Sequence, residues 1–227
     1  ATSDDPNDRG SSRRHIVRGV EKSLERLRTD WLDILYLHHW DENTALEESL
    51  AAVTHLVSQG KVLHAAVSNF SAWQIMKAIA VAERHGFAPV TAVQPMYNLV
   101  KRQAEVEILP LALSERLAVC PYSPMAAGLL SGKYRQGASG RLDTNEVYKS
   151  RYRDPAYREV ADRFVSYAQE RGQSPAALAV AWVMAHSAVT SAIVGARDLA
   201  QFEESLRSVD IQLSPEQRAE ITALSID

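Results

Sequence analysis

Short apolar runs alternate with longer amphipathic stretches along most of the chain. The runs have the length of a strand and are almost continuously apolar, at residues 32–37, 62–67, 90–93, 117–120 and 190–194. Such runs are typical of strands that are buried on both faces, as in a parallel sheet. Apolar residues recur at helical spacing in the stretches 13–27, 46–58, 72–83, 104–114, 175–185, 199–208 and 214–225. Because each crossover between parallel strands needs a helix, the pattern predicts an α/β fold.

Residues that start helices stand at several of these boundaries. Ser11 or Ser12 can cap the first helix, and Ser71 can cap the third. Thr44 and Glu47 have the spacing of a capping box at the start of the second helix. The helix boundaries therefore agree with the apolar pattern.

The stretch 131–155 interrupts the alternation. It is rich in Gly, Arg, Lys, Asp and Tyr and has neither a strand nor a helix period. A long excursion after a strand predicts a loop over a functional site. A solvated insertion without a role is the alternative.

The number of strands raises a question of architecture. A closed barrel of parallel strands needs eight, and fewer strands leave open edges with unpaired backbone groups. Two architectures remain, an open doubly wound sheet and an incomplete barrel. Residues 1–10 are a polar, Asp-rich lead-in that runs directly into a helix pattern, which favours the barrel. We therefore expect one TIM-type (β/α)8 barrel domain over residues 1–227, lacking roughly the first three β/α units.

Composition excludes several classes of partner. The chain is 46% hydrophobic and 23% charged, enough to bury a large core. Its formal net charge of −3 offers no basic excess for nucleic acid or for an anionic membrane surface. The single cysteine, Cys120, lies in an apolar run and fits a reducing compartment. With no long apolar stretch and no leader pattern, we expect a cytoplasmic protein with no membrane span.

Polar residues follow the predicted strands, where barrel enzymes carry their catalytic groups. His38 and His39 follow the first strand, and Asn69 and Gln94 end the second and third. Neighbouring strand residues point to opposite faces, so only one histidine of the pair can face the barrel mouth. Asn69 and Gln94 each offer a donor and an acceptor in one plane, which suits an amide ligand.

Several of these stretches resemble the signatures of the aldo-keto reductase family. Residues 121–134, Pro-Tyr-Ser-Pro-Met-Ala-Ala-Gly-Leu-Leu-Ser-Gly-Lys-Tyr, are similar almost residue by residue to its Tyr-Ser-Pro-Leu…Gly-Leu-Leu-Thr-Gly-Lys-Tyr signature. Residues 30–40 resemble the strand that ends in His-Trp, and residues 67–70, 94–98 and 193–205 resemble three further family segments. The resemblance covers essentially the whole chain.

The resemblance implies a role for each matching residue. His39 would orient and polarise the substrate carbonyl, His38 would point into the helix layer, and Trp40 would line the substrate pocket. Arg197 suits a 2′-phosphate and so favours NADPH over NADH, whereas Ser205 replaces the family's asparagine. No metal is implied. The residues expected to bind NADPH or NADP+ are Ser68, Asn69 and Gln94 at the carboxamide, Tyr122 on the nicotinamide, Ser123, Met125, Gly128 and Lys133 at the pyrophosphate, and Gly195, Arg197, Gln201 and Glu204 at the adenosine phosphate.

The implied activity is the NADPH-dependent reduction of aldehydes and ketones to alcohols. The partner would be a small carbonyl substrate, and the stretch 131–155 would lie near the cofactor. The family's proton-transfer tyrosine, lysine and aspartate belong to segments that precede residue 1, so this chain alone is expected to reduce carbonyls poorly. Two alternatives remain: a cofactor-binding regulatory subunit resembling potassium-channel β subunits, and an open sheet with another ligand such as a flavin.

Overall fold

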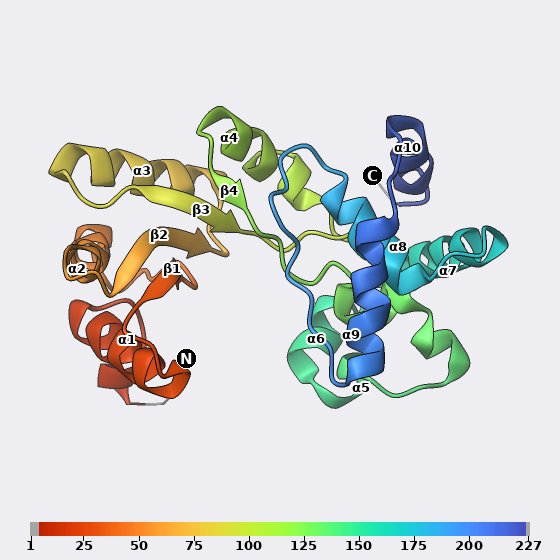
Figure 1. Ribbon diagram of the computed structural model, residues 1–227, viewed down its shortest axis with the longest axis horizontal. Coiled ribbons are helices and arrows are strands. Elements are labelled where there is room, and N and C mark those ends of the chain that lie inside the picture. Colours follow the sequence, from red (N-terminus) through yellow and green to blue (C-terminus); the bar gives the residue numbers. More distant parts are fainter. Residues whose placement is uncertain (1–4, 226–227) are drawn as a thin grey trace. The chain divides into compact units, whose positions relative to one another are not determined.

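The computed structural model describes residues 5–225, and contacts group the chain into two compact units. The first unit comprises Ala1–Pro95 and Leu111–Ala118, and the second comprises Met96–Pro110 and Val119–Asp227. Figure 1 shows the order of the elements along the chain by colour.

The first unit consists of parallel strands joined by helices (Figure 1). After η1 (Pro6–Asp8), its elements are α1 (Arg13–Leu27), β1 (Leu32–Leu37), α2 (Leu46–Ser58), β2 (Val62–Ser68), α3 (Ala72–His85) and β3 (Val90–Gln94). Leu32 pairs with Val62 and Ser68 with Gln94, both in parallel register. The short β4 (Ala118–Val119) completes the sheet order β1-β2-β3-β4. The predicted α/β alternation is confirmed in this unit.

Local signals explain where these helices begin and end. Ser12 accepts a hydrogen bond from the His15 N–H, as expected for the cap of α1. Ser71 caps α3, which ends at Gly86 with a φ of 63° in the left-handed region. The capping box predicted for Thr44 and Glu47 is wrong, because α2 starts one residue later, with Ala45 as its N-cap. The Thr44 hydroxyl instead donates to Asp41, at 2.8 Å.

β1 is the edge strand of the sheet, and its burial differs from that of β2. In β2, Val62, Ala66 and Val67 are at most 2% exposed, as near-continuous apolar strands of parallel sheets usually are. β2 is exposed near its start, where Leu63 is 47% exposed, whereas in β1 only Leu37 is buried and Ile34 is 38% exposed. The apolar run of β1 was therefore a correct signal for a strand but not for burial of the whole run.

The second unit is mainly helical around an apolar core. Its longer helices are α7 (Pro155–Glu170), α8 (Pro175–Met184), α9 (Leu199–Leu206) and α10 (Pro215–Thr222). Trp182 and Phe164, from α8 and α7, are fully buried. The shorter elements are η2 (Gln103–Glu105), α4 (Ile108–Ser114, which continues into the first unit), η3 (Ala126–Ser131), η4 (Lys133–Gln136), α5 (Arg141–Thr144), α6 (Glu146–Arg151) and η5 (Arg207–Asp210).

The second unit also contains the largest departures from the predicted elements. The predicted strand 190–194 is wrong: the Ser191 N–H donates to Val119 O, and Tyr122 and Ile193 form an isolated parallel bridge, but no continuous ladder forms. The α7 helix was missed, although its buried Val160, Phe164 and Ala168 have helical spacing. The stretch 131–155 holds η4, α5 and α6 rather than continuous loop.

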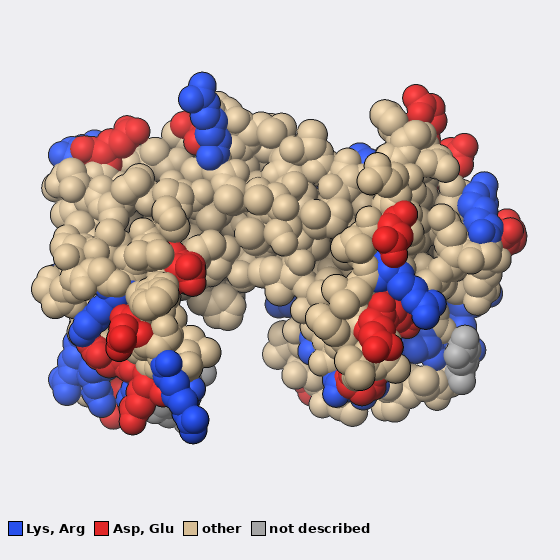
Figure 2. Space-filling view, in the orientation of Figure 1, with Lys and Arg blue, Asp and Glu red and all other residues tan. Residues whose placement is uncertain are grey.

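The surface carries charges of both signs. Figure 2 shows Lys, Arg, Asp and Glu interspersed over α1, with no patch of one sign there. Among the described residues, no helix is both long and apolar enough to cross a membrane. The same residues contain no group of His, Cys, Asp and Glu side chains that could hold a metal ion.

Candidate functional site

A cavity of about 520 Å³ in the second unit is the main candidate site. Its volume lies within the range of small-molecule and cofactor pockets. All nine second-unit residues that the sequence assigned to the cofactor line it, although they are spread over more than eighty positions of the chain. These residues are Tyr122, Ser123, Met125, Gly128, Lys133, Gly195, Arg197, Gln201 and Glu204.

The backbone that follows Tyr122 is strained around this cavity. Ser123, Ala126 and Ala127 have φ values of 59°, 50° and 57°, in a region that non-glycine residues rarely adopt. Such residues persist only where surrounding contacts hold them, and they concentrate at functional sites. The fully buried Asn98 supplies one such contact, because its Nδ2 donates to Ser123 O at 3.0 Å. A buried contact therefore helps to hold the turn after Tyr122 in its strained conformation.

Three cations converge on the cavity: Lys133, Arg141 and Arg197. Burial lowers the pKa of the Lys133 amine, and the charges of Arg197 and Arg141 lower it further, against Asp143, which raises it. Among residues 5–225, no ion pair is formed by any of the three cations. Cations that repel one another beside a cavity are typical of a site for an anion such as phosphate.

Two glycines make room for the Lys133 side chain. Gly128 has a φ of 91°, and a Cβ added there would lie 2.6 Å from Lys133 Cε. A Cβ on Gly140 would collide with Lys133 Nζ and with the Tyr134 hydroxyl. The position of the Lys133 amine thus depends on glycine at both places.

Arg141 and Tyr148 line the cavity but were not among the predicted site residues. Both come from the stretch 131–155, on α5 and α6, and the Arg141 guanidinium lies 5.6 Å from the centre of the Tyr148 ring. Part of this stretch therefore forms a wall of the cavity. The available signal was its repeated Arg and Tyr, but without a helical or strand period their directions could not be assigned.

The α9 helix supplies another part of the cavity lining. Its N-cap Asp198 accepts from the Gln201 N–H at 2.9 Å, and Gln201 Oε1 accepts from the Arg197 N–H at 3.3 Å. Glu204 Oε1 accepts from the Ser174 hydroxyl at 2.7 Å. Ser205, which also lines the cavity, donates its hydroxyl to Gln201 O at 2.9 Å. Local hydrogen bonds therefore orient the polar groups of this wall.

A second set of predicted residues meets at the carboxyl ends of β2 and β3 in the first unit. The Ser68 hydroxyl donates to the backbone oxygen of Gln94 at 2.9 Å and lies 3.3 Å from its Oε1. Asn69 has a φ of 54°, and its Nδ2 donates to His38 O at 2.9 Å. The structure therefore brings Ser68, Asn69 and Gln94 together beside the histidine pair, as expected for strand ends of one sheet.

The two histidines after β1 lie close together. Their rings are 4.5 Å apart, centre to centre, and both residues are exposed. His39 lines a small cavity of about 10 Å³ together with Leu37 of β1 and with Leu46 and Ser49 of α2. Because β1 ends at Leu37, strand alternation does not assign the two side chains to opposite faces. The roles expected for His38 and His39 therefore remain predictions.

Trp40 also contacts the helix layer. Its ring lies 5.4 Å from that of Phe70 and 5.3 Å from that of Trp73, which is at the start of α3. The Lys77 amine, one turn further along α3, lies 5.5 Å from the Trp40 ring. These contacts place Trp40 against α3, whereas its role in substrate binding remains a prediction.

Nearly the whole chain matches a known protein family. The family model described as "Aldo/keto reductase family" matches residues 2–226. The chain belongs to this family. For an aldo/keto reductase, whose fold is a TIM barrel, the parallel sheet β1-β2-β3-β4 with its crossover helices is consistent with part of the barrel, and the predicted fold class is confirmed.

Three relatives show the range of the family. The aldo/keto reductase chain is 36% identical over 214 residues to a probable voltage-gated potassium channel subunit beta of Arabidopsis thaliana, covering 91% of this chain and 65% of the relative. It is 36% identical over 219 residues to an uncharacterized oxidoreductase of Bacillus subtilis, covering 94% and 64%. It is 32% identical over 217 residues to a norsolorinic acid reductase of Emericella nidulans, covering 95% and 54%. The chain thus spans about half to two thirds of the length of these relatives.

Proposed function

We propose that the cavity of the second unit binds NADPH, and that the whole protein uses it to reduce aldehydes and ketones to alcohols. One observation carries the proposal: the nine second-unit residues that resemble the family's cofactor signatures line a single cavity, where Lys133, Arg141 and Arg197 have no ion-pair partner among the described residues. Relatives named as oxidoreductases and reductases support the same class of reaction.

The chemistry of the cavity residues fits this cofactor. NADPH carries a pyrophosphate and a 2′-phosphate, and Arg141 and Arg197 can each donate paired hydrogen bonds to phosphate oxygens, while Lys133 supplies a point charge. Burial raises the pKa of the Tyr122 phenol, so its ring is neutral near pH 7 and suited to stacking on a nicotinamide. When bound, the cofactor supplies the hydride.

The histidine pair at the end of β1 supplies the candidate for polarising the carbonyl. The family resemblance points to His39 for this role, and the His38 ring lies 4.5 Å from it. A histidine N–H that donates to the carbonyl oxygen would stabilise the negative charge that develops there as hydride arrives. Ser68, Asn69 and Gln94 would hold the carboxamide of the nicotinamide.

A cofactor-binding regulatory subunit is the second candidate function. It is favoured by the relatives from Arabidopsis thaliana and Oryza sativa that are named as probable potassium channel subunits, each 36% identical to this chain. Both candidates need the cavity for the cofactor. They differ in turnover, which a regulatory role does not require.

Cofactor binding is tested by titrating the purified chain with NADPH and with NADH, following nicotinamide fluorescence. Because a hydrogen bond to a charged group contributes about 1.5–3 kcal/mol, Arg197→Met or Arg141→Met should weaken NADPH binding by about 10- to 100-fold. NADH lacks the 2′-phosphate, so its binding should be weakened less than that of NADPH by the variant whose arginine contacts this phosphate. Arg153→Met is the matched control, since Arg153 is exposed and does not line the cavity. Equal weakening by all three variants would refute the assignment.

Carbonyl reduction is tested on the whole protein by aldehyde-dependent loss of NADPH absorbance. His39→Asn should lower kcat more than His38→Asn does, without changing the Kd for NADPH. The reverse order would assign the catalytic role to His38. A whole protein that binds NADPH tightly but shows no aldehyde-dependent turnover would contradict the proposed reduction and favour the regulatory candidate.

A further inference from the structure

The loop that follows β1 is fastened by the carboxylate of Asp41. Its Oδ2 accepts from the Ser11 N–H at 2.7 Å and from the Thr44 hydroxyl at 2.8 Å, and its Oδ1 accepts from the Asn43 N–H at 2.9 Å. Two of these bonds shape the loop itself. The bond from Ser11 ties the loop to the segment before α1, thirty residues earlier.

The segment before α1 is built around this contact. Gly10 has a φ of 79°, and a Cβ added to it would lie 2.7 Å from Asp41 Oδ2, so a side chain there would displace the carboxylate. The carbonyl oxygen of Ser11 accepts a hydrogen bond from the Ser49 hydroxyl of α2, at 2.7 Å. Ser11 is therefore held through its N–H by the loop and through its C=O by α2.

A second anchor holds the same loop at its start. Asn69, at the end of β2, donates its Nδ2 to His38 O at 2.9 Å. His38 and His39 therefore lie between two fixed points, the Asn69 amide and the Asp41 carboxylate. Their rings are only 4.5 Å apart, centre to centre, and His39 lines a small cavity together with Ser11 and Asp41.

Charge strengthens the Asp41 contacts. Burial would raise the pKa of Asp41, but the hydrogen bonds from Ser11, Asn43 and Thr44 outweigh it and hold the pKa below its ordinary value. The carboxylate is therefore ionised at neutral pH, and the hydrogen bonds that it accepts are charge-assisted. Such bonds are shorter and stronger than those between neutral groups.

We propose that Asp41 is a positioning residue for the histidine pair: by joining the Gly10–Ser11 segment to the loop after β1, it fixes the backbone that presents His38 and His39. The inference rests on the proposed role of one of these histidines in carbonyl reduction. It assigns Asp41 no contact with substrate or cofactor.

The test compares variants that disrupt the contact between Asp41 and the Gly10–Ser11 segment with a control variant that removes a charge elsewhere in the first unit. Asp41→Ala deletes the acceptor, and Gly10→Ala pushes the carboxylate away. Thr44→Val, which removes one hydrogen bond, is the milder variant in case the others do not fold. Asp33→Asn is the matched control, because Asp33 is an exposed carboxylate of β1, and none of its side-chain contacts is part of this arrangement.

The main readout is the NMR spectrum of the histidine ring protons in the full chain, assigned with His38→Asn and His39→Asn. Two rings 4.5 Å apart shift each other's resonances. Asp41→Ala and Gly10→Ala should remove this mutual shift, Thr44→Val should reduce it, and Asp33→Asn should leave it unchanged. Histidine resonances unaffected in Asp41→Ala, with only the unfolding midpoint lowered, would show that Asp41 merely caps the loop and would overturn the inference.

Kinetics provide the second readout. Since small misplacements of a catalytic group can cost up to about 100-fold, Asp41→Ala should lower kcat by at least about tenfold while the Kd for NADPH stays unchanged. Unchanged kcat in Asp41→Ala, in a chain whose wild type turns over, would also contradict the inference. A whole wild-type protein without turnover would refute the proposed reduction, whereas the ring resonances would still decide the role of Asp41.

Discussion

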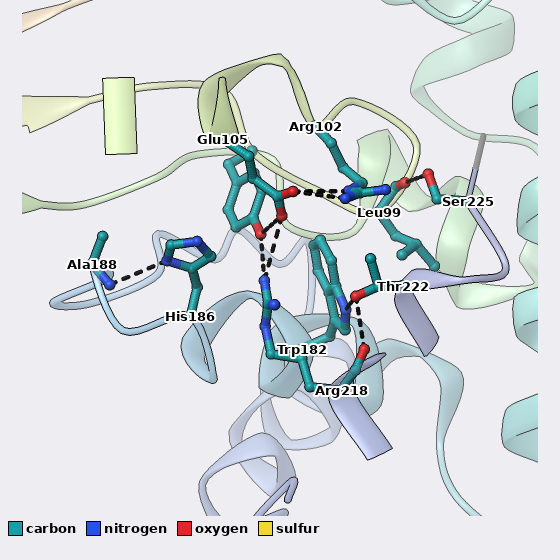
Figure 3. Close-up of polar contacts among 10 residues, drawn as sticks. Leu99, Arg102, Glu105, Trp182, His186, Ala188, Arg218, Thr222 and Ser225 are labelled. Carbon is teal, nitrogen blue, oxygen red and sulfur yellow. Dashed lines mark hydrogen bonds and ion pairs between the residues drawn. The ribbon is translucent and has the colours of Figure 1, made fainter. Parts of the chain in front are cut away.

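Glu105 connects three side chains of the second unit through one carboxylate (Figure 3). Its Oε2 accepts two hydrogen bonds from Arg102, at 3.1 and 2.8 Å. Its Oε1 accepts from the Tyr97 hydroxyl and lies 3.4 Å from Arg218 Nη2, which also donates to that hydroxyl at 2.8 Å. Because Arg218 is on α10 and its guanidinium lies 5.0 Å from the Trp182 ring of α8, the cluster fastens the C-terminal helix to the core.

Replacing Glu105 with Gln keeps the shape and removes the charge. Breaking a fully buried ion pair costs about 3–5 kcal/mol, whereas an exposed pair contributes about 0–1 kcal/mol. The side chains of Glu105, Arg102 and Arg218 are 20%, 23% and 22% exposed, between these limits. We therefore expect Glu105→Gln to lower the free energy of unfolding of the second unit by about 2 kcal/mol.

Urea unfolding followed by Trp182 fluorescence measures this loss. Trp182 is fully buried beside the cluster, and the other three tryptophans lie in the first unit, where they can be replaced by phenylalanine. With a urea slope of about 2 kcal/mol/M, the midpoint should fall by about 1 M. Glu107→Gln, an exposed carboxylate two residues away, should change the free energy by less than about 0.5 kcal/mol. Equal midpoints for the two variants would refute the reasoning.

The same substitution should change the response to acid. Burial would raise the pKa of Glu105, but the hydrogen bonds from Arg102 and Tyr97 and the charges of Arg102 and Arg218 outweigh it, so the pKa in the folded chain lies below its ordinary value. The stabilisation is then present above the ordinary glutamate pKa of about 4.3 and is lost as the pH falls through the folded pKa. Glu105→Gln should lack this part of the acid loss of stability.

Two further predictions concern the cavity and the end of α8. Gly128→Ala should weaken NADPH binding more than Gly137→Ala does, because both glycines have positive φ but only a Cβ on Gly128 meets the Lys133 side chain; equal affinities in fluorescence titrations would contradict this. Burial, aided by a neighbouring guanidinium, lowers the pKa of His186, whose Nδ1 accepts from the Ala188 N–H. The unfolded chain then binds this proton at a higher pH than the folded chain does. The urea midpoint should therefore decrease as the pH is lowered below about 6.5, and His186→Gln should reduce this decrease.

The residues that line the cavity of the second unit could be grouped from the sequence because short motifs contain them. Tyr122 to Lys133 form one continuous signature, and Gly195 to Glu204 form another. The convergence of the two on one cavity was expected from strand ends of a shared sheet. The structure brings the two motifs together, even though the strand predicted before Gly195 is reduced to an isolated bridge, and their binding of a cofactor stays a prediction.

Tertiary contacts decided what the sequence could not indicate. Arg141 and Tyr148 lie on α5 and α6, helices of four and six residues that are too short to show a period. The α7 helix, in contrast, had a clear signal in the spacing of its apolar residues and in the cap formed by Asp154 before Pro155. The helices α5 and α6 could not be predicted from the spacing of apolar residues, whereas α7 could.

The histidine pair shows why a motif alone cannot assign a direction. Adjacent residues at the end of a strand differ by one step of alternation, so an error of one position exchanges the barrel mouth for the helix layer. β1 ends at Leu37, however, so His38 and His39 already belong to the loop that follows the strand. Their rings lie 4.5 Å apart, closer than side chains on opposite faces of a strand would come, so loop contacts rather than strand alternation set their directions. These contacts include the bond from Asn69 to His38 O and the bonds that Asp41 accepts. If His38→Asn lost more activity than His39→Asn, the resemblance would have matched the family's histidine one position too late, and the catalytic role would pass to His38.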